Sequence, residues 1–228
     1  MKQWFALALC LFCAWTLVAQ EHEQQRLKAS YEVLHDILGM PDKGIPRDLL
    51  NKADCVIVVP SMKKAAFIVG ASYGRGTMLC RSGENFRGPW SAPAFFALEG
   101  GSFGLQAGGE ATDYVILVMN DKGARSVMSS KVKLGGDASA AAGPVGRTTS
   151  AETDVLMNAE MLSWSRSKGL FAGVSLEGST IRSDDEANKK LYGKELNAKQ
   201  IIMQREVKTP PAGEPLVKLL DRVSPKHA

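Results

Sequence analysis

The pattern of hydrophobic and polar positions divides the chain into a helical start, a strand-rich centre and a helical end. Between residues 20 and 38, apolar residues recur every three or four positions, which predicts an amphipathic helix. A second, short helix is predicted over 45–53, where Pro46 suits the first turn. The run "CVIVVP", residues 55–60, is then typical of a strand that is buried on both faces.

The centre of the chain, to about residue 119, has the pattern of strands joined by glycine-rich turns. The segments expected to be strands are 65–74, 76–82, 92–100, 101–109 and 113–120. A short helix is expected at 120–130, followed by a strand and loop of small residues at 131–147. The segments 160–167 and 169–178 are predicted to pair as a hairpin across Ser167, Lys168 and Gly169.

The last part of the chain carries helix-start and helix-stop signals. In "SDDEANKKLYG", Ser183 can cap a helix, Glu186 can complete a capping box, and Gly193 can end the helix. Another helix is expected at 197–207. The proline-rich segment 209–215 is expected to be a linker, and 216–224 a terminal amphipathic stretch.

These elements predict one α+β domain: a curved, mainly antiparallel, barrel-like β-sheet flanked by helices at both termini. We divide the chain into an export segment (1–19), an N-terminal helical segment (20–52), a domain core (53–206), and a proline-containing linker with a C-terminal tail (207–228). Eighteen of the 22 glycines lie between Gly70 and Gly178. Glycine inside strands indicates bends or close approach of another backbone, so these features are expected in the sheet.

The first residues have the composition of a secretory signal peptide. Lys2 gives a positive start, residues 4–19 are almost wholly apolar, and the chain then turns polar, which favours cleavage near Ala19. This run is shorter than the roughly 20 residues of a membrane anchor. We therefore expect an exported protein, periplasmic or secreted. Beyond this segment the cysteines are Cys55 and Cys80, which could form a disulfide or remain two buried free thiols on adjacent strands.

Charge and residue spacing give no support to catalysis or to nucleic-acid binding. The net charge of +4 is too small to predict a nucleic-acid partner. No dinucleotide fingerprint, phosphate-binding P-loop or zinc-type cysteine pair occurs, so we expect no cofactor, no metal and no catalytic residue. Four carboxylates near the glycine-rich turns are expected to be turn and surface residues: Glu99, Glu110, Asp113 and Asp137. The histidines lie outside the glycine-rich centre, at His22, His35 and His227.

Several central stretches resemble those of the SYLF-domain family, in order and in spacing. They include "WSAPAFF", "GSFGLQAGGEATDYVILVMN", "SWSRSKGLFAGVSLEGSTI" and "ANKKLYG", and the resemblance covers about residues 30–205. The family is a lipid-binding module associated with phospholipids, and its yeast-type members with actin regulation. The resemblance therefore implies a non-catalytic protein that binds phospholipid at a membrane surface. Because an exported protein is kept away from actin, we expect actin not to be a partner.

The resemblance and the positions of the cations together give candidate lipid-binding residues. Arg166 and Lys168 lie at the turn of the predicted hairpin, and Arg147 and Arg75 are further cations that could meet a lipid phosphate.

Apolar residues near this turn leave two interpretations open. Leu170 and Phe171 could hold an acyl chain, although we expect them to be core. Trp164 and Trp90 could be interfacial anchors, and core packing is again favoured. The alternative function is a structural or interaction protein of the cell envelope, which binds a protein partner at an exposed strand edge.

Overall fold

The computed structural model describes residues 21–40, 44–66, 69–83, 85–103, 108–129, 131–145, 158–167 and 170–225, without the side chains of 65–66, 69, 102–103 and 108–110. The N-terminal helix is described over residues 21–38. The elements that follow are α2 (Arg47–Lys52), β1 (Cys55–Ala66), β2 (Val69–Cys80), β3 (Ala94–Phe103), β4 (Gly108–Val118), α3 (Asp121–Ser129), β5 (Val132–Lys133), β6 (Ala140–Ala142), β7 (Met161–Ser167), β8 (Leu170–Gly173), β9 (Thr180–Ser183), α5 (Asp185–Tyr192), α6 (Ala198–Ile202), the 3₁₀ turn η1 (Pro211–Gly213) and α7 (Glu214–Val223). The predicted export segment, residues 1–19, lies outside the described residues.

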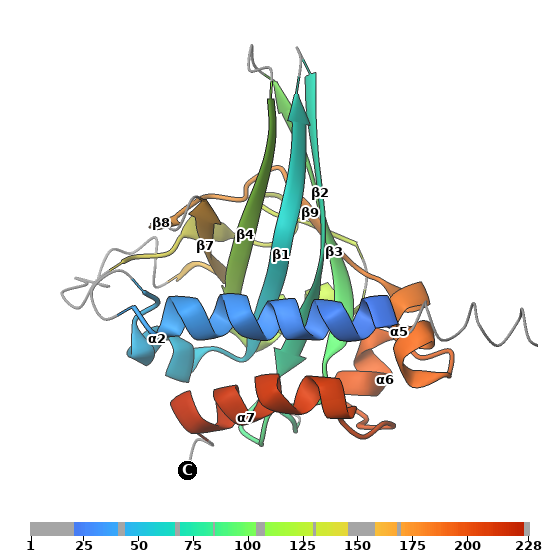
Figure 1. The fold of residues 1–228 in the computed structure, drawn as a ribbon. Helices are drawn as coiled ribbons and strands as arrows, with labels where there is room; N and C mark the ends of the chain where they lie inside the picture. Colours follow the sequence, from blue (N-terminus) through green and yellow to red (C-terminus); the bar gives the residue numbers. More distant parts are fainter. Residues whose placement is uncertain are drawn as a thin grey trace, which may run out of the picture.

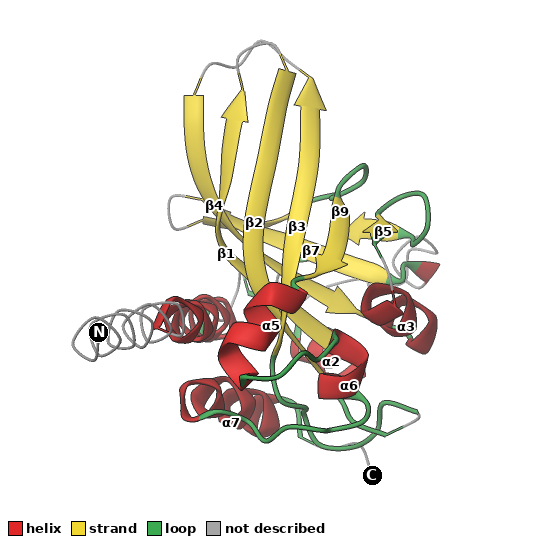
Figure 2. Ribbon diagram, turned by 90° about the vertical axis from the view of Figure 1, so that its right-hand side faces the viewer, coloured by secondary structure: helices red, strands yellow, loops and turns green. Residues whose placement is uncertain are grey.

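The strands form one curved sheet of mixed type, which confirms the predicted fold class. Its order is β5-β9-β3-β2-β1-β4-β7-β6, and β8 also pairs with β7. Among the described strands, every pairing is antiparallel except that of β6 with β7. Figure 1 shows the N-terminal helix crossing the lower part of this sheet, with α7 beneath it. In Figure 2 the long strands β1–β4 rise beyond the helices that surround their lower ends.

Both faces of the lower sheet are buried, as the unbroken apolar run in β1 predicts. Ile57 points into one core, which contains Met78 of β2 and is covered by α3 and α6. Val56 and Val58 point into the opposite core, between the sheet and the N-terminal helix, α2 and α7. Each side chain in this run is therefore removed from water, which explains why the run is continuous and not alternating.

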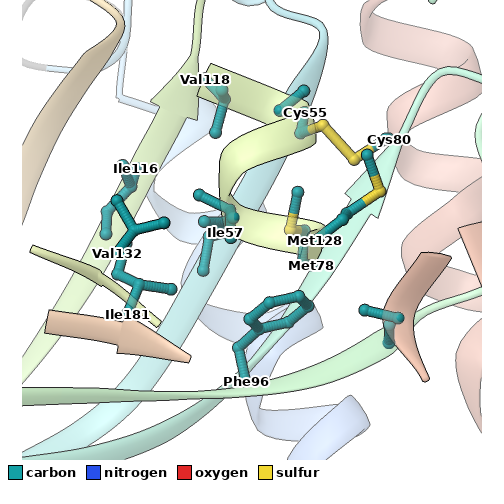
Figure 3. Close-up of a cluster of buried hydrophobic side chains, with 14 of the residues drawn as sticks. Cys55, Ile57, Met78, Cys80, Phe96, Ile116, Val118, Met128, Val132 and Ile181 are labelled. Carbon is teal, nitrogen blue, oxygen red and sulfur yellow. A yellow bond between two sulfur atoms is a disulfide. The ribbon is translucent and has the colours of Figure 1, made fainter. Parts of the chain in front are cut away.

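Cys55 and Cys80 are joined by a disulfide in the structure. The two residues lie directly opposite each other in β1 and β2, and their sulfur atoms are 2.06 Å apart. Figure 3 shows the bond at the edge of a buried cluster that contains Ile57 and Phe96. The disulfide therefore ties the lower ends of two central strands, inside the core.

Gly173 of the predicted hairpin and Gly143, which follows β6, allow close backbone packing. Strands β6 and β8 share one edge of β7, and they meet at Gly143 and Gly173. A Cβ atom on Gly173 would lie 1.9 Å from the carbonyl oxygen of Gly143, and one on Gly143 would lie 2.1 Å from the Trp164 indole. Only glycine fits at either position, because any side chain would overlap these atoms. The predicted pairing of β7 with β8 is confirmed, with Ser167 opposite Leu170.

Some predicted element boundaries are wrong. The segments 65–74 and 101–109, each expected to be one strand, contain the ends of β1 and β2 and of β3 and β4. Alternating small residues give no signal for where a hairpin turns, and this explains the error. The helix expected over 197–207 is the shorter α6.

The helix α5 begins one residue later than predicted. Its N-cap is Asp184, whose carboxylate accepts a hydrogen bond from the Ala187 N–H. Ser183 instead donates its hydroxyl to Asp185. The predicted end is confirmed, because Gly193 adopts the left-handed conformation with φ of 67°.

The proline-rich segment near the C-terminus leads into a docked helix. Leu216 and Leu220 of α7 are fully buried against the sheet. The buried Arg81 side chain donates from Nη2 to the Ser224 carbonyl at 3.0 Å and to its hydroxyl at 2.6 Å. Trp90 also donates to the Ser224 carbonyl, at 3.0 Å. Arg81 thus supplies a positive charge at the C-terminal end of α7, where helix carbonyls need donors.

Candidate anion-binding cleft

An open cleft of about 420 Å³ lies between the N-terminal helix and strands β1 and β2. Figure 1 shows the N-terminal helix crossing the lower part of the sheet, in front of these strands. Residues that line the cleft are Gln25, Arg26, Ala29, Pro60, Ser61, Lys63, Tyr73, Gly74 and Arg75. Three cationic side chains from three elements therefore converge on one surface depression.

A β-bulge in β1 creates the floor of the cleft. The register of β1 against its neighbours shifts between Val59 and Met62, and Ser61 has a φ of 51°. Asp113 of β4 stabilises this conformation, because its carboxylate accepts a hydrogen bond from the Ser61 N–H at 2.8 Å. The extra residue shifts the alternation of side chains by one, so Lys63 faces the N-terminal helix.

Two of the three cations are already paired with acids. Arg75 donates from Nε to Asp184 at 2.6 Å, and its Nη2 lies 2.6 Å from the same oxygen. Arg26 approaches Glu23 at 2.7 Å and Asp184 at 4.0 Å. Burial disfavours the charged form of Asp184, but the hydrogen bond and charge of Arg75 outweigh it and hold the pKa of Asp184 below its ordinary value. This network joins the N-terminal helix, β2 and α5.

Lys63 is the cation of the cleft that is most available to a ligand. Its side chain is exposed, and it takes part in no ion pair with the part of the chain that the structure describes. The two acids and three cations leave the cleft with a net charge of about +1 at neutral pH. Tyr73, which is 46% exposed, adds a hydroxyl donor at the cleft edge. The arrangement can hold an anion with weak, salt-sensitive affinity.

The structure places the predicted site residues in different environments. Arg75 lines the cleft, whereas Arg166 lies on β7, two strands away from β1. The guanidinium of Arg166 donates to Asp113 at 2.7 Å and to Asp36 at 2.5 Å. Asp113 also accepts the hydrogen bond from the Ser61 N–H in the bulge. Arg166 therefore stabilises the floor of the cleft indirectly, through Asp113. Lys168 and Arg147 lie outside the described residues.

The aromatic candidates are buried, and one aliphatic residue is not. Trp164 is 0% exposed and donates from Nε1 to the Pro144 carbonyl at 3.0 Å, and Trp90 is also buried. Phe171 is 7% exposed, so its expected core position is confirmed. The same expectation for Leu170 is wrong, because its side chain is 67% exposed. Leu170 lies opposite Ser167, which is the last residue of β7. Leu170 is therefore at the end of the described hairpin, where β7 and β8 stop.

Sequence reasoning missed Arg26, Lys63 and Tyr73 as members of a site. Pro60 inside a strand-like run was the available signal, because proline in a central strand indicates a bulge. No cluster of metal-ligating side chains occurs within the described ranges. Nor does any described helix have the length and apolarity to cross a bilayer.

Comparisons with known proteins find relatives along most of the chain. The Ysc84 family model, described as "Las17-binding protein actin regulator", matches residues 99–223. LAS seventeen-binding protein 3 of Saccharomyces cerevisiae is 34% identical over 209 residues, which is 90% of this chain and 44% of the yeast protein. Protein YSC84 of the same yeast is 37% identical over 183 residues, 79% of this chain and 38% of its own length.

A vertebrate relative shows the same partial coverage. SH3 domain-containing YSC84-like protein 1 of Bos taurus is 33% identical over 188 residues, which is 82% of this chain and 54% of the bovine protein. The chain thus spans less than half the length of the two yeast relatives and about half that of the bovine one. The description of the matched family and the name of LAS seventeen-binding protein 3 are those of binding proteins.

Proposed function

Because the chain belongs to the SYLF (Ysc84) family, we propose that it is a non-catalytic protein that binds anionic phospholipid head groups at a membrane surface. The resemblance drawn from the central motifs is confirmed by these matches. The observation that carries the proposal is the cleft, where Lys63, Arg75 and Arg26 converge and Lys63 has no ion-pair partner among the described residues.

The chemistry of the cleft suits a lipid phosphate. The Lys63 ammonium can approach an anion without first losing a partner among the described residues. Arg75, with side-chain exposure of 32%, uses Nε and Nη2 for Asp184 and retains N–H groups at Nη1. Each cation near an anionic bilayer contributes about 1 kcal/mol. Binding through this cleft alone is therefore weak and decreases with salt.

We also propose that the protein acts outside the cytoplasm, in the periplasm or as a secreted protein. Two observations support this location. The first 19 residues have the composition of a signal peptide. Cys55 and Cys80 form a disulfide, and disulfides form and persist mainly in oxidising compartments.

Charge reversal at Lys63 tests the proposed site. Lys63→Glu changes the local charge by two, so we expect vesicle binding to weaken roughly 30-fold at low salt, from about 1 kcal/mol per charge. Lys208→Glu is the matched control, because Lys208 is also exposed and lies in the segment before η1. Co-flotation with vesicles of phosphatidylcholine and phosphatidylglycerol measures both variants. Equal binding by the two variants would remove the cleft from the proposal.

A second candidate function is binding of a protein partner. The description of the matched family and the name of its relative LAS seventeen-binding protein 3 favour it. The expectation that actin is not a partner gains no support from these names. Pull-down of purified Las17 and co-sedimentation with actin filaments would test this function. Binding of either at low micromolar concentration, without co-flotation with vesicles, would favour the second candidate over the first.

A further inference from the structure

The carboxylate of Asp113 connects the bulge of β1 with a guanidinium on β7. Its Oδ1 atom accepts a hydrogen bond from the Ser61 N–H at 2.8 Å, and its Oδ2 atom accepts one from Nε of Arg166 at 2.7 Å. Nη1 of the same arginine lies 2.5 Å from Asp36 of the N-terminal helix. The two oxygens of Asp113 therefore bind two different groups, a charged side chain and the backbone of the bulge.

Arg166 holds the Asp113 carboxylate in one orientation. The arginine lies directly opposite Asp113 in β4 and opposite Phe171 in β8, and its guanidinium lies over the Phe171 ring at 5.5 Å. The side chains of Arg166 and Asp113 are only 21% and 16% exposed. Partial burial and a charge-assisted hydrogen bond both restrict rotation of the carboxylate, so Oδ1 stays directed at Ser61.

The backbone conformation of Ser61 depends on such a partner. Its φ of 51° lies in the left-handed region, which residues other than glycine rarely adopt. A conformation of this kind persists where the surrounding structure holds it in place. The ionised carboxylate of Asp113 is a suitable holder, because hydrogen bonds to charged acceptors are roughly twice as strong as those between neutral groups.

The bulge decides which face of the sheet carries Lys63. Val58 and Met62 are four residues apart in β1, so a regular strand would place both side chains on one face. Instead, Val58 points into the core beside the N-terminal helix and Met62 into the opposite core. Lys63 consequently lies opposite Tyr73 and lines the cleft. Without the bulge, Lys63 would point to the other face and the cleft would lose this cation.

We propose that Asp113 is a positioning residue of the anion-binding cleft, which acts by holding the Ser61 bulge that turns Lys63 toward the N-terminal helix. Asp113 itself is not among the residues that line the cleft. The inference rests on the proposed function and adds to it an acidic residue on which the affinity for an anion depends. Loss of this acid weakens anion binding, which is the opposite of its direct electrostatic effect.

Asp113→Ala tests the role, because it removes the acceptor of the Ser61 N–H together with one negative charge. The lost charge alone would strengthen binding to anionic vesicles, whereas displacement of Lys63 weakens it. We expect co-flotation with vesicles of phosphatidylcholine and phosphatidylglycerol to weaken, by up to about fivefold for one displaced cation. Asp48→Ala is the matched control, since Asp48 is an exposed acid on α2, and this variant should bind no more weakly than the parent protein.

Two double variants show whether the effect passes through Lys63 and the bulge. Lys63→Glu weakens binding of the parent protein roughly 30-fold, and in the Asp113→Ala background it should weaken binding by less than about fivefold. Ser61→Gly should restore binding to Asp113→Ala, because glycine adopts a positive φ without support. A merely structural role of Asp113 would lower the melting temperature without giving this rescue.

The remaining outcomes separate the positioning role from the proposed function. Unchanged or stronger binding by Asp113→Ala, while Lys63→Glu still weakens binding of the parent protein, overturns the role and leaves the function standing. Weaker binding that Ser61→Gly does not restore also overturns the role. If Asp113→Ala does not fold, folding and binding of the double variant with Ser61→Gly support the role, and its failure to fold overturns it. Absence of co-flotation by the parent protein overturns the proposed function and this inference with it.

Discussion

Substitution of Gly173 by alanine tests the packing at the meeting point of β6 and β8. The new Cβ atom would lie 1.9 Å from the Gly143 carbonyl oxygen, whereas ordinary contact begins at 3.4 Å, so the backbones must separate by about 1.5 Å. That movement breaks hydrogen bonds that the Ser163 carbonyl accepts from the N–H of Gly143 at 2.9 Å and of Val174 at 3.0 Å. Each lost bond costs about 1 kcal/mol, and overpacking costs about 1–3 kcal/mol more. We expect a total loss of about 3–5 kcal/mol.

Thermal and urea unfolding measure this loss. A chain of this size loses about 2–4 °C in Tm per kcal/mol, so Gly173→Ala should melt roughly 6–20 °C below the parent protein. Gly101→Ala is the matched control, because Gly101 also lies in a strand and a Cβ atom on it would meet no neighbouring atom of the described chain within 4 Å. The control should stay within about 0.5 kcal/mol of the parent protein. Equal melting of the two variants would refute the explanation of Gly173 in β8.

Three further changes test other parts of the account. Burial, with the charge of Asp121 as a second cause, raises the pKa of Asp54 to about 6, so ionising Asp54 costs stability in the folded protein as the pH rises from about 4 to about 6. Asp54→Asn should therefore raise the free energy of unfolding at pH 7 by about 1–2 kcal/mol, a figure reduced for the partial solvent contact of Asp54. At pH 4 the same substitution should change the free energy of unfolding little. An equal effect at both pH values would contradict this reasoning. Arg166→Met removes an arginine that bridges two carboxylates and should lower the free energy of unfolding, measured in urea, by about 1–3 kcal/mol; an unchanged midpoint would show that these ion pairs contribute nothing. Replacement of Cys55 and Cys80 by alanine opens a loop with a sequence separation of 25 and should cost about 3 kcal/mol, and a reducing agent should then have no further effect on the melting temperature.

The fold was predictable wherever the pattern of side chains is periodic. The apolar run of β1 and the helical spacing of the first helix each indicate one conformation, and both are present. The turns of the long hairpins could not be located, because small residues on both sides of each turn give no alternation. The cap of α5 was misplaced by one residue, since Ser183 and Asp184 are both good caps and only the contact of Asp184 with Arg75 favours one of them.

The site was less predictable than the fold, because it depends on contacts between distant segments. The candidate Arg75 does line the cleft, but its cationic neighbours Arg26 and Lys63 come from the N-terminal helix and from β1. Lys63 faces the helix only because a bulge shifts the alternation along β1 by one residue. Arg166 is a sequence candidate because it lies near the turn of the predicted hairpin, and only the structure shows that its guanidinium bridges two carboxylates.

The most direct test of the central claim is co-flotation of the purified protein with vesicles of neutral and of anionic phospholipid, at low and at high salt. The account predicts little flotation with phosphatidylcholine alone and clear flotation when phosphatidylglycerol is included, and this flotation decreases at high salt. Absence of flotation with both kinds of vesicle, at either salt concentration, would contradict the phospholipid-binding function.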